Sequence, residues 1–385
     1  MTDRLYYADQ YMREFTARVV SCEPKGDAWT VTLDRTAFYP EGGGQPGDTG
    51  RIGAARVTGT HERAGKVLHT TDAPLAPGSE LECAIDWERR FDLMQQHSGE
   101  HIVSGIVHSR FGLDNVGFHM GAEVITIDFS GVLTLGQLRE VEYEANRAVW
   151  RDSETKIEVL SGSELARRSY RSKKELEGDV RLVEFPGSDV CACCGTHVRR
   201  TGEIGCIRLI SCQKLRSGVR VEMVSGERAY RYFDSVANAN HAVSVALSSP
   251  ERDTPEALER LFGLNRELKQ RAAALEDRLF EDLAGRCSGK TLIFEPDLTP
   301  DSVRRLCDAV IRRTGELCCV FSGADVEGYS YALGCPGGDI RGLVREMNAA
   351  LSGRGGGKNG FAQGRAAASR EEITAFFAGK DIKEI

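Results

Sequence analysis

The chain has 385 residues, 41% hydrophobic and 28% charged, and a formal net charge of −7 at pH 7, values that fit a globular protein of two or three domains. The negative charge argues against nonspecific nucleic-acid binding through the overall electric field, and no apolar run reaches the roughly 18 residues of a membrane span, so we expect no membrane partner. The polar start, residues 1–4, is unlike a signal peptide, and the 12 cysteines suit a reducing compartment, so we expect a cytoplasmic protein.

Residues 1–85 carry short β-type stretches, such as 17–20 and 29–33, separated by glycine and proline. This pattern predicts a small barrel or sandwich. The segment also contains a glycine-rich run over 38–50. Tight turns and a hairpin would explain this run, and contact with the end of a substrate is the alternative.

Residues 86–228 alternate between helical and strand patterns, which predicts an α+β layer structure. The predicted helices cover 87–111, 136–151 and 161–177. The predicted strands cover 124–129, 156–160, 180–185, 204–210 and 219–224.

Two pairs of metal-binding residue types lie in this central block. His97 and His101 are four residues apart, so they share one face of the amphipathic helix predicted for 87–111. Cys193 and His197 form a second pair in a loop-like segment, and imidazole with thiolate suits zinc. The two pairs therefore predict one zinc site, and the alternative is a chance spacing of ordinary packed residues.

The surroundings of these pairs narrow the interpretation. Zinc peptidases place a general-base glutamate directly after the first histidine, whereas this chain has Ser98 there, which argues against a peptidase. Cys191 lies close enough in the sequence to compete as a ligand. Histidines outside the two pairs, such as His69 and His108, are expected to be packed or solvated residues.

Residues 229–284 have a helical pattern with a break at 248–250. Beyond the break, two sets of mostly apolar residues recur every seven positions. The sets are Leu258, Asn265, Ala272 and Leu279, and Leu261, Leu268 and Leu275. With little over three heptads, the pattern predicts either a dimerising coiled coil over 255–284 or a helical arm packed on its neighbours.

Residues 285–385 alternate strand patterns (291–294, 317–321, 330–333) with helix patterns (299–314, 338–351). A glycine-rich run over 353–364 follows and contains Arg354 and Lys358, with Arg365 directly after it. Glycines let a backbone approach a phosphate closely and the cations supply charge, but the sequence that ends a nucleotide-binding P-loop is absent. The alternatives are a flexible connector and an ordinary solvated face.

Taken together, these motifs resemble those of the alanyl-tRNA synthetase editing family, in particular its free-standing, trans-editing AlaX members in their long form. The run over 38–45, the two zinc pairs and the segments 201–205 and 218–222 look like the family's motifs. The run over 353–364 looks like the end of the family's DHHA1 domain, which engages tRNA. The resemblance covers nearly the whole chain.

The resemblance implies an α+β fold in four parts. These are a small N-terminal β-barrel (1–85), a zinc-binding α+β editing domain (86–228), a helical arm (229–284) and an α/β DHHA1-like, tRNA-binding domain (285–385). Because no class II aminoacylation domain is recognisable ahead of the editing region, we expect the chain not to charge tRNA. A homodimer is expected, if one forms, through the 255–284 helix or the C-terminal domain.

The activity that the resemblance implies is ATP-independent hydrolysis of the ester joining a wrong amino acid to tRNA(Ala), chiefly serine and secondarily glycine. A site for alanine cannot exclude smaller glycine by sterics and rejects an added hydroxyl only weakly, so a second hydrolytic site is needed. The alternatives are a noncatalytic tRNA-binding zinc protein and a deacylase for another mischarged tRNA.

The resemblance also implies roles for single residues. His97, His101, Cys193 and His197 are the expected ligands of one Zn²⁺, and His97, His101 and His119 are the expected catalytic residues. Zinc could take part in the hydrolysis by polarising the ester or activating water. Four protein ligands would close a tetrahedral site, however, so the alternative is that zinc only positions the substrate.

Further contacts are implied on either side of this site. Family members recognise the seryl hydroxyl with a polar side chain on the strand after the zinc helix, where His119 is the nearest candidate, and Thr126 and Asp128 follow on the next strand. The other expected contacts are Gly43, Gly44 and Gln45 to the substrate, and Arg354, Lys358 and Arg365 to tRNA.

Overall fold

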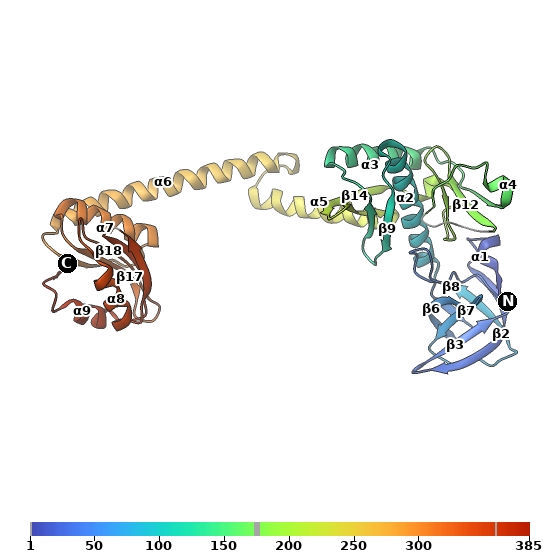
Figure 1. The fold of residues 1–385 in the computed structure, drawn as a ribbon, viewed down its shortest axis with the longest axis horizontal. Helices are drawn as coiled ribbons and strands as arrows, with labels where there is room; N and C mark the ends of the chain where they lie inside the picture. Colours follow the sequence, from blue (N-terminus) through green and yellow to red (C-terminus); the bar gives the residue numbers. More distant parts are fainter. Residues whose placement is uncertain (1, 173–177, 359) are drawn as a thin grey trace. The chain divides into compact units, whose positions relative to one another are not determined.

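The computed structural model describes residues 2–172, 178–358 and 360–385, and the chain divides into two compact units, Met1–Asn240 and His241–Ile385. Both units combine helices with strands (Figure 1), which confirms the predicted α+β class. Among the described residues, no helix has both the length and the apolar character needed to cross a membrane.

Six antiparallel strands near the N-terminus close into a barrel. Their order is β2 (Glu14–Lys25), β3 (Ala28–Leu33), β7 (Lys66–Thr71), β6 (Ala55–Arg63), β5 (Gly50–Ile52) and β8 (Glu80–Ile85). Alternate side chains, such as Val19, Val31 and Leu33, are buried in its interior. Three short elements, β1 (Asp3–Arg4), α1 (Leu5–Ala8) and β4 (Arg35–Thr36), flank the barrel.

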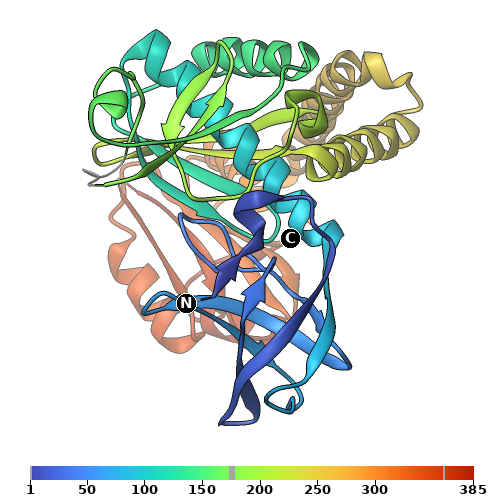
Figure 2. The same ribbon diagram turned by 90° about the vertical axis from the view of Figure 1, so that its right-hand side faces the viewer.

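The barrel leads directly into the long helix α2 (Trp87–Phe111), which runs into the central part of the first unit (Figures 1 and 2). Asp86 caps its start by accepting a hydrogen bond from the backbone N–H of Arg89, and Gly112, with a φ of 65°, ends it. Every residue from 96 to 107 is buried, because neighbouring elements cover the helix on several sides. The helix predicted over 87–111 is therefore confirmed.

A four-stranded antiparallel sheet shares its core with α2 and with α3 (Leu135–Trp150). The strands, in order, are β14 (Ile207–Leu215), β15 (Gly218–Ser225), β10 (Ile125–Phe129) and β9 (Asn115–Met120). Alternate residues of β10, namely Ile125, Ile127 and Phe129, point into this core. The predicted strand over 204–210 was wrong at its start, because Thr201–Ile204 forms the 3₁₀ helix η1.

A second, three-stranded antiparallel sheet leads into the loop that contains Cys193 and His197. Its strands are β11 (Lys156–Leu160), β12 (Val180–Phe185) and β13 (Asp189–Ala192). The helix predicted over 161–177 is confirmed only as the single turn α4 (Gly162–Leu165) and is wrong for residues 166–172. Residues 173–177 of that prediction lie outside the described residues.

The helical stretch consists of α5 (Gly226–Leu247), η2 (Glu251–Asp253) and α6 (Thr254–Arg286), so the predicted break near 248–250 is confirmed. In the second unit, a six-stranded sheet has helices on both faces. Its strands, in order, are β19 (Arg354–Lys358), β20 (Phe361–Ala366), β18 (Gly328–Gly334), β17 (Cys318–Ala324), β16 (Thr291–Phe294) and β21 (Lys383–Glu384). The C-terminal end of α6 and α7 (Pro300–Thr314) share a core with one face. Helices α8 (Arg341–Ala350) and α9 (Arg370–Phe377) share a core with the other.

The second glycine-rich run forms the edge of this sheet. Residues 354–358 pair antiparallel with 361–365, so the alternative of a flexible connector is wrong for these residues. A Cβ on Gly355 would lie 2.2 Å from the hydroxyl of Tyr331 and 2.5 Å from the carbonyl oxygen of Gln363. Glycine is required there because the two strands and the tyrosine leave no room for a side chain.

Candidate metal centre

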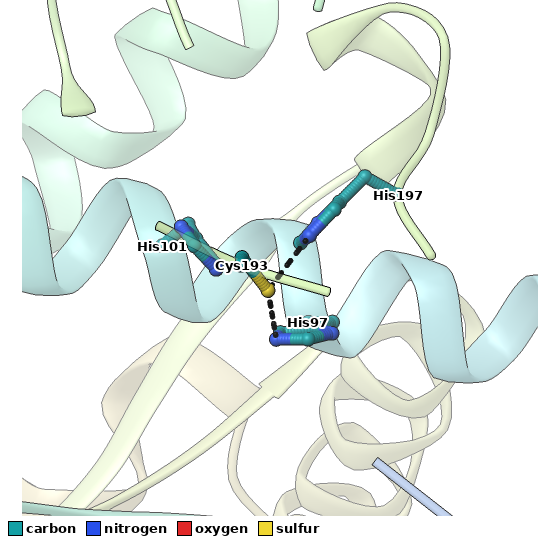
Figure 3. Close-up of side chains that lie close together, drawn as sticks. All are labelled: His97, His101, Cys193 and His197. Carbon is teal, nitrogen blue, oxygen red and sulfur yellow. Dashed lines mark hydrogen bonds between the residues drawn. The ribbon is translucent and has the colours of Figure 1, made fainter. Parts of the chain in front are cut away.

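Helix α2 and the loop after β13 bring the four predicted ligands together. His97 and His101 project from one face of α2, and Cys193 and His197 approach from the loop (Figure 3). The ligand atoms of the four residues all lie within 4.8 Å of one another, and all three histidines are buried. The four-residue spacing of each pair allows this convergence, but the contact between the pairs is a product of the tertiary fold.

The distances within the cluster fit zinc. The sulfur of Cys193 lies 3.6 Å from Nε2 of His97 and 3.4 Å from Nε2 of His197. Bonds of 2.3 Å to sulfur and about 2.05 Å to nitrogen, at a tetrahedral angle, would separate those two atoms by about 3.6 Å. The donor set of one thiolate and three imidazoles is also one that zinc accepts.

Each of the three imidazoles has its other ring nitrogen, Nδ1, next to an oxygen atom. Nδ1 of His97 lies 2.9 Å from Oε1 of Gln45, and Nδ1 of His101 lies 2.9 Å from a carboxylate oxygen of Asp189. Nδ1 of His197 lies 3.3 Å from the hydroxyl of Ser98. Since these oxygens can accept the Nδ1 proton, Nε2 of each ring is left as the metal-binding atom, which is the usual arrangement around protein-bound zinc.

Asp189 is itself held by Arg171. The guanidinium donates two hydrogen bonds to the carboxylate, of 2.7 Å from Nε and 2.8 Å from Nη2. Burial by itself would raise the pKa of Asp189, but His101 and Arg171 outweigh burial and lower it. The carboxylate is therefore ionised at neutral pH and fixes the orientation of the His101 ring.

The electrostatics of the cluster favour a thiolate. Burial raises the pKa of Cys193, but the neighbouring imidazoles, His97 first, outweigh burial and hold that pKa well below its ordinary value. Burial and the nearby His97 also hold the pKa of His197 well below its ordinary value. Burial lowers the pKa of His101, yet Cys193 and Asp189 outweigh it and raise that pKa well above normal. A bound cation would displace this proton.

Two glycines allow the surrounding loops to approach the cluster. A Cβ on Gly195, between the two loop ligands, would lie 2.2 Å from Cε1 of His97. A Cβ on Gly44 would lie 2.6 Å from the ring of Phe118, and the φ of Gly44 is +84°, which disfavours any other residue. Phe118 in turn stacks on His97 with 5.7 Å between the ring centres. The first glycine-rich run thus reaches the cluster through packing.

The predicted substrate residues of this run have different surroundings. Gly43 lines a cavity of about 330 Å³ next to His97, His101 and Cys193. Gln45 is fully buried, and its amide bonds to protein groups: Nε2 donates to the hydroxyl of Thr196 at 2.7 Å, and Oε1 accepts from the backbone N–H of Thr196 at 3.1 Å. In this geometry the amide oxygen of Gln45 lies next to Nδ1 of His97, and the substrate contact expected from the sequence stays a prediction.

Glu100 also lines the cavity, and sequence reasoning gave it no role. Its side chain is almost completely buried, and its Oε1 accepts hydrogen bonds of 2.5 Å from Ser104 and from Nδ2 of Asn115. Burying an ionised carboxylate costs free energy unless it is hydrogen-bonded or paired with a positive charge. The sequence signal was its place between His97 and His101, because position i+3 shares the helix face of position i.

His119, Thr126 and Asp128 lie on the other face of the four-stranded sheet. Thr126 and Asp128 alternate with the core residues of β10, and His119 is paired with Thr126 across the strands. His119 is exposed, Asp128 forms an ion pair with Arg220, and none of the three lines the cavity. It is Phe118, one position earlier, that faces the cluster, so the structure places His119, Thr126 and Asp128 away from the cavity, and their expected roles stay predictions.

Cys191 belongs to a second set of potential ligand atoms, together with His101 and Asp189. Burial raises the pKa of its thiol to about 11, so the thiol stays protonated at neutral pH. Because Asp189 already binds Nδ1 of His101 and Arg171, the set that contains Cys193 is the better metal site.

The predicted tRNA contacts lie in the second unit. Arg354 and Arg365 are opposite each other on β19 and β20, and both are exposed. Lys358, at the end of β19, borders a concave surface that also contains Arg341, Arg345 and the backbone of Gly355–Gly357. Cations beside exposed glycine backbone form a surface suited to phosphate groups.

Comparisons with known proteins agree with these motifs. The family model for the threonyl and alanyl tRNA synthetase second additional domain matches residues 180–222, which contain Cys193 and His197. The model for class II (A) tRNA synthetases matches residues 7–89, which contain the barrel.

Similarity to whole proteins extends further. The chain is 28% identical to the alanyl-tRNA editing protein AlaX-L of Pyrococcus horikoshii, over 97% of this chain and 96% of that protein. It is 31% identical to the alanyl-tRNA editing protein Aarsd1 of Mus musculus, over 66% of each. It is 32% identical to the alanine–tRNA ligase of Ignicoccus hospitalis, over 93% of this chain but only 40% of the ligase. The chain therefore belongs to the family of alanyl-tRNA editing proteins.

Proposed function

We propose that this chain is a cytoplasmic, ATP-independent deacylase that hydrolyses mischarged aminoacyl-tRNA(Ala), chiefly Ser-tRNA(Ala) and secondarily Gly-tRNA(Ala). The observation that carries the proposal is the buried cluster of three imidazoles and one thiolate beside a cavity of about 330 Å³. The names of the similar proteins from Pyrococcus horikoshii and Mus musculus support it.

In this proposal, His97, His101, Cys193 and His197 hold one zinc ion. When bound there, zinc supplies Lewis acidity for polarising an ester carbonyl or for lowering the pKa of water. Gln45 and Asp189 fix the rings of His97 and His101, which keeps the cluster organised before substrate arrives. Phe118 shields His97 from water on the cavity side.

Glu100 is the group that we assign to the amino acid. Every aminoacyl ester carries an α-ammonium group, and a carboxylate that borders the cavity is its natural partner. Hydrogen bonds from Ser104 and Asn115 occupy only Oε1 of Glu100 and fix the direction of the carboxylate. Residues 86–228 therefore serve as the editing domain, with Gly43 of the barrel domain (1–85) at the edge of the cavity.

Residues 285–385 serve in this proposal as the tRNA-binding domain, joined through the helical arm 229–284. Arg354, Lys358 and Arg365 would contact phosphates. Replacing all three by glutamine should weaken tRNA binding and reduce the slope of log affinity against log salt by about 0.7 to 0.9 per lost contact. An unchanged slope would remove these residues from the interface.

The deciding experiment is a deacylation time course with seryl-, glycyl- and alanyl-tRNA(Ala). The wild type should hydrolyse the first fastest and spare the third. His97→Ala should abolish hydrolysis but retain tRNA binding, whereas His108→Ala, a change of an exposed histidine on the same helix, should behave as wild type. Hydrolysis of a different mischarged tRNA alone would reassign the substrate.

A noncatalytic, tRNA-binding zinc protein is the second candidate. It is favoured by the count of four protein ligands, which fills a tetrahedral site. Under this alternative the wild type hydrolyses none of the three substrates. Chelation of the metal then lowers the unfolding temperature, and no deacylation is seen with or without the metal.

A further inference from the structure

One arginine at the cavity beside the candidate metal centre has an unused hydrogen-bond donor. Arg181 is the second residue of β12, and it lines this cavity together with His97 and Cys193. Its Nη2 is buried and has no hydrogen-bond partner in the described part of the chain. Burying a charged donor without an acceptor costs free energy, so such a group needs an explanation. A ligand that brings the acceptor into the cavity would supply one.

The rest of the Arg181 side chain is held in place. Its Nη1 donates hydrogen bonds of 2.7 Å to the carbonyl oxygen of Cys193 and 3.1 Å to that of Gly195. The centre of the Tyr7 ring lies 5.5 Å from Cζ of Arg181. These contacts fix the guanidinium beside the loop of the candidate metal ligands. A ligand that binds Nη2 therefore meets a group that is already oriented, which lowers the entropy cost of binding.

The positive charge of Arg181 is not neutralised by a carboxylate. Arg171 lines the same cavity, but its guanidinium is paired with the buried carboxylate of Asp189. Glu100 and Asp179 also line the cavity, yet none of the ion pairs among the described residues joins either of them to Arg181. The two backbone carbonyls bound by Arg181 are neutral dipoles. Arg181 therefore offers the cavity a positive charge that an anionic ligand can use.

The proposed substrate carries such an anion close to its scissile ester. The ester joins the amino acid to the terminal ribose of the tRNA, and a phosphodiester on the 5′ oxygen of that ribose joins it to the preceding nucleotide. The α-ammonium group is the positive charge of the same aminoacyl nucleotide, and the proposed function pairs it with Glu100. The guanidinium of Arg181 matches phosphate oxygens in both charge and geometry. Each charge of the aminoacyl nucleotide would then have a partner of opposite sign at the cavity.

We propose that Arg181 binds the phosphodiester that joins the last two nucleotides of the tRNA. This inference rests on the proposed function, because it takes an aminoacyl-tRNA as the ligand. A nonbridging phosphate oxygen accepts a hydrogen bond from Nη2, while Nη1 keeps its bonds to the carbonyls of Cys193 and Gly195. The ring of Tyr7 beside the guanidinium is 40% exposed, so it can turn aside as the phosphate arrives.

The binding of two ligands that resist hydrolysis tests this proposal. The first is 3′-deoxy-3′-(L-serylamino)adenosine, in which an amide replaces the ester, and the second is the same compound with a methyl phosphodiester on its 5′ oxygen. In calorimetric titrations of the full, zinc-loaded chain, the wild type should bind the second ligand roughly 10- to 100-fold more tightly than the first. Arg181→Gln should abolish this preference and leave the affinity for the first ligand unchanged. Equal binding of the two ligands by the wild type, or an undiminished preference in Arg181→Gln, overturns the proposal.

A control variant and the comparison of the two ligands separate phosphate binding from support of the loop. Arg168→Gln changes an arginine that is paired with Glu158 and Glu184 and does not line the cavity, so it should keep the wild-type preference. If Arg181→Gln weakens the binding of both ligands equally, the arginine only supports the loop and the proposal fails. The deacylation time course is a separate measurement: a wild type that hydrolyses no aminoacyl-tRNA refutes the proposed function, whereas equal binding of the two ligands refutes only the phosphate contact of Arg181.

Discussion

The amide oxygen of Gln45 lies 2.9 Å from Nδ1 of His97, although the two residues are 52 positions apart in the chain. This contact joins the glycine-rich run that precedes β5 to the helix that carries two of the candidate metal ligands. The neighbouring Thr196 holds the same glutamine amide at both ends, because its backbone N–H donates to Oε1 of Gln45 and its hydroxyl oxygen accepts a hydrogen bond from Nε2 of Gln45. The residues ahead of β5 therefore contribute to the candidate metal centre by holding the ring of His97 in position.

Removing this support should weaken metal binding. Gln45→Ala leaves Nδ1 of His97 without its partner, and loss of such an outer partner costs roughly 10- to 100-fold in metal affinity. Competition with a chromophoric zinc chelator measures the change, with Gln213→Ala, at an exposed position on β14, as the control. Equal affinity in the Gln45 variant and the wild type would contradict the assigned role.

Asp189→Asn should affect both metal binding and folding. The change removes the negative charge that His101 and Arg171 share in a buried site, and breaking a buried pair costs about 3–5 kcal/mol. Asp128→Asn, in the more exposed pair with Arg220, should cost about 1 kcal/mol or less. Urea unfolding in the presence of a chelator compares the two. If Asp128→Asn lowers deacylation and Asp189→Asn does not, the result would support the substrate contact that the sequence predicts for Asp128.

Phe118→Ala should lower deacylation and His119→Ala should not, although the two residues are neighbours in the sequence. Phe118 stacks on His97 and lines the cavity, so its loss should lower kcat/KM roughly tenfold, or about 1.4 kcal/mol. His119 is exposed on the other face, so its loss should change kcat/KM little. Steady-state kinetics with Ser-tRNA(Ala) decides between them, and a large effect at His119 alone would mean that the strand presents its other face to substrate.

Glu100→Gln should remove the contact with the α-ammonium group. A hydrogen bond to a charged group contributes about 1.5–3 kcal/mol, so kcat/KM for Ser-tRNA(Ala) should fall by roughly 10- to 100-fold. N-acetyl-Ser-tRNA(Ala), which has no ammonium group, should be hydrolysed equally by the variant and the wild type. A parallel loss on both substrates would show that Glu100 supports the site in another way.

The stability of the barrel should fall in mild acid because of His69. Its Nδ1 donates to the carbonyl of Val31 and its Nε2 accepts from Thr36, and burial lowers its pKa to about 4. In the unfolded chain His69 has an ordinary pKa near 6.5 and so takes up a proton before the folded protein does. The contribution of neutral His69 to stability is therefore complete above pH 6.5 and is lost as the pH falls toward 4. The loss between pH 7.5 and pH 5 should be about 2 kcal/mol.

Urea unfolding of metal-free protein measures this effect without a contribution from zinc release. His69→Gln should be less stable at pH 7.5 but should lose less of its stability on going to pH 5. If the variant and the wild type lose the same amount, other groups are responsible for the acid sensitivity.

Several features of this protein follow from local sequence patterns. The four-residue spacing of His97 and His101 places them on one face of α2, whatever the rest of the fold, because 3.6 residues make a turn. The heptad repeat of α6 likewise determines which apolar residues share one side of that helix, namely Leu258, Leu261, Leu268, Leu275 and Leu279. By contrast, the pattern over 161–177 predicted a helix that residues 166–172 do not form, since tertiary context overrides weak helical preference.

Only the tertiary structure decided which groups surround the candidate metal ligands. Strand alternation reverses the side-chain direction at every residue, so an unknown register left Phe118 and His119 indistinguishable until β9 was paired with β10. The partners of the imidazoles, Gln45 and Asp189, lie 52 and 88 positions away from them. No local pattern specifies such contacts, because they depend on how the barrel, the long helix and the loop after β13 pack together.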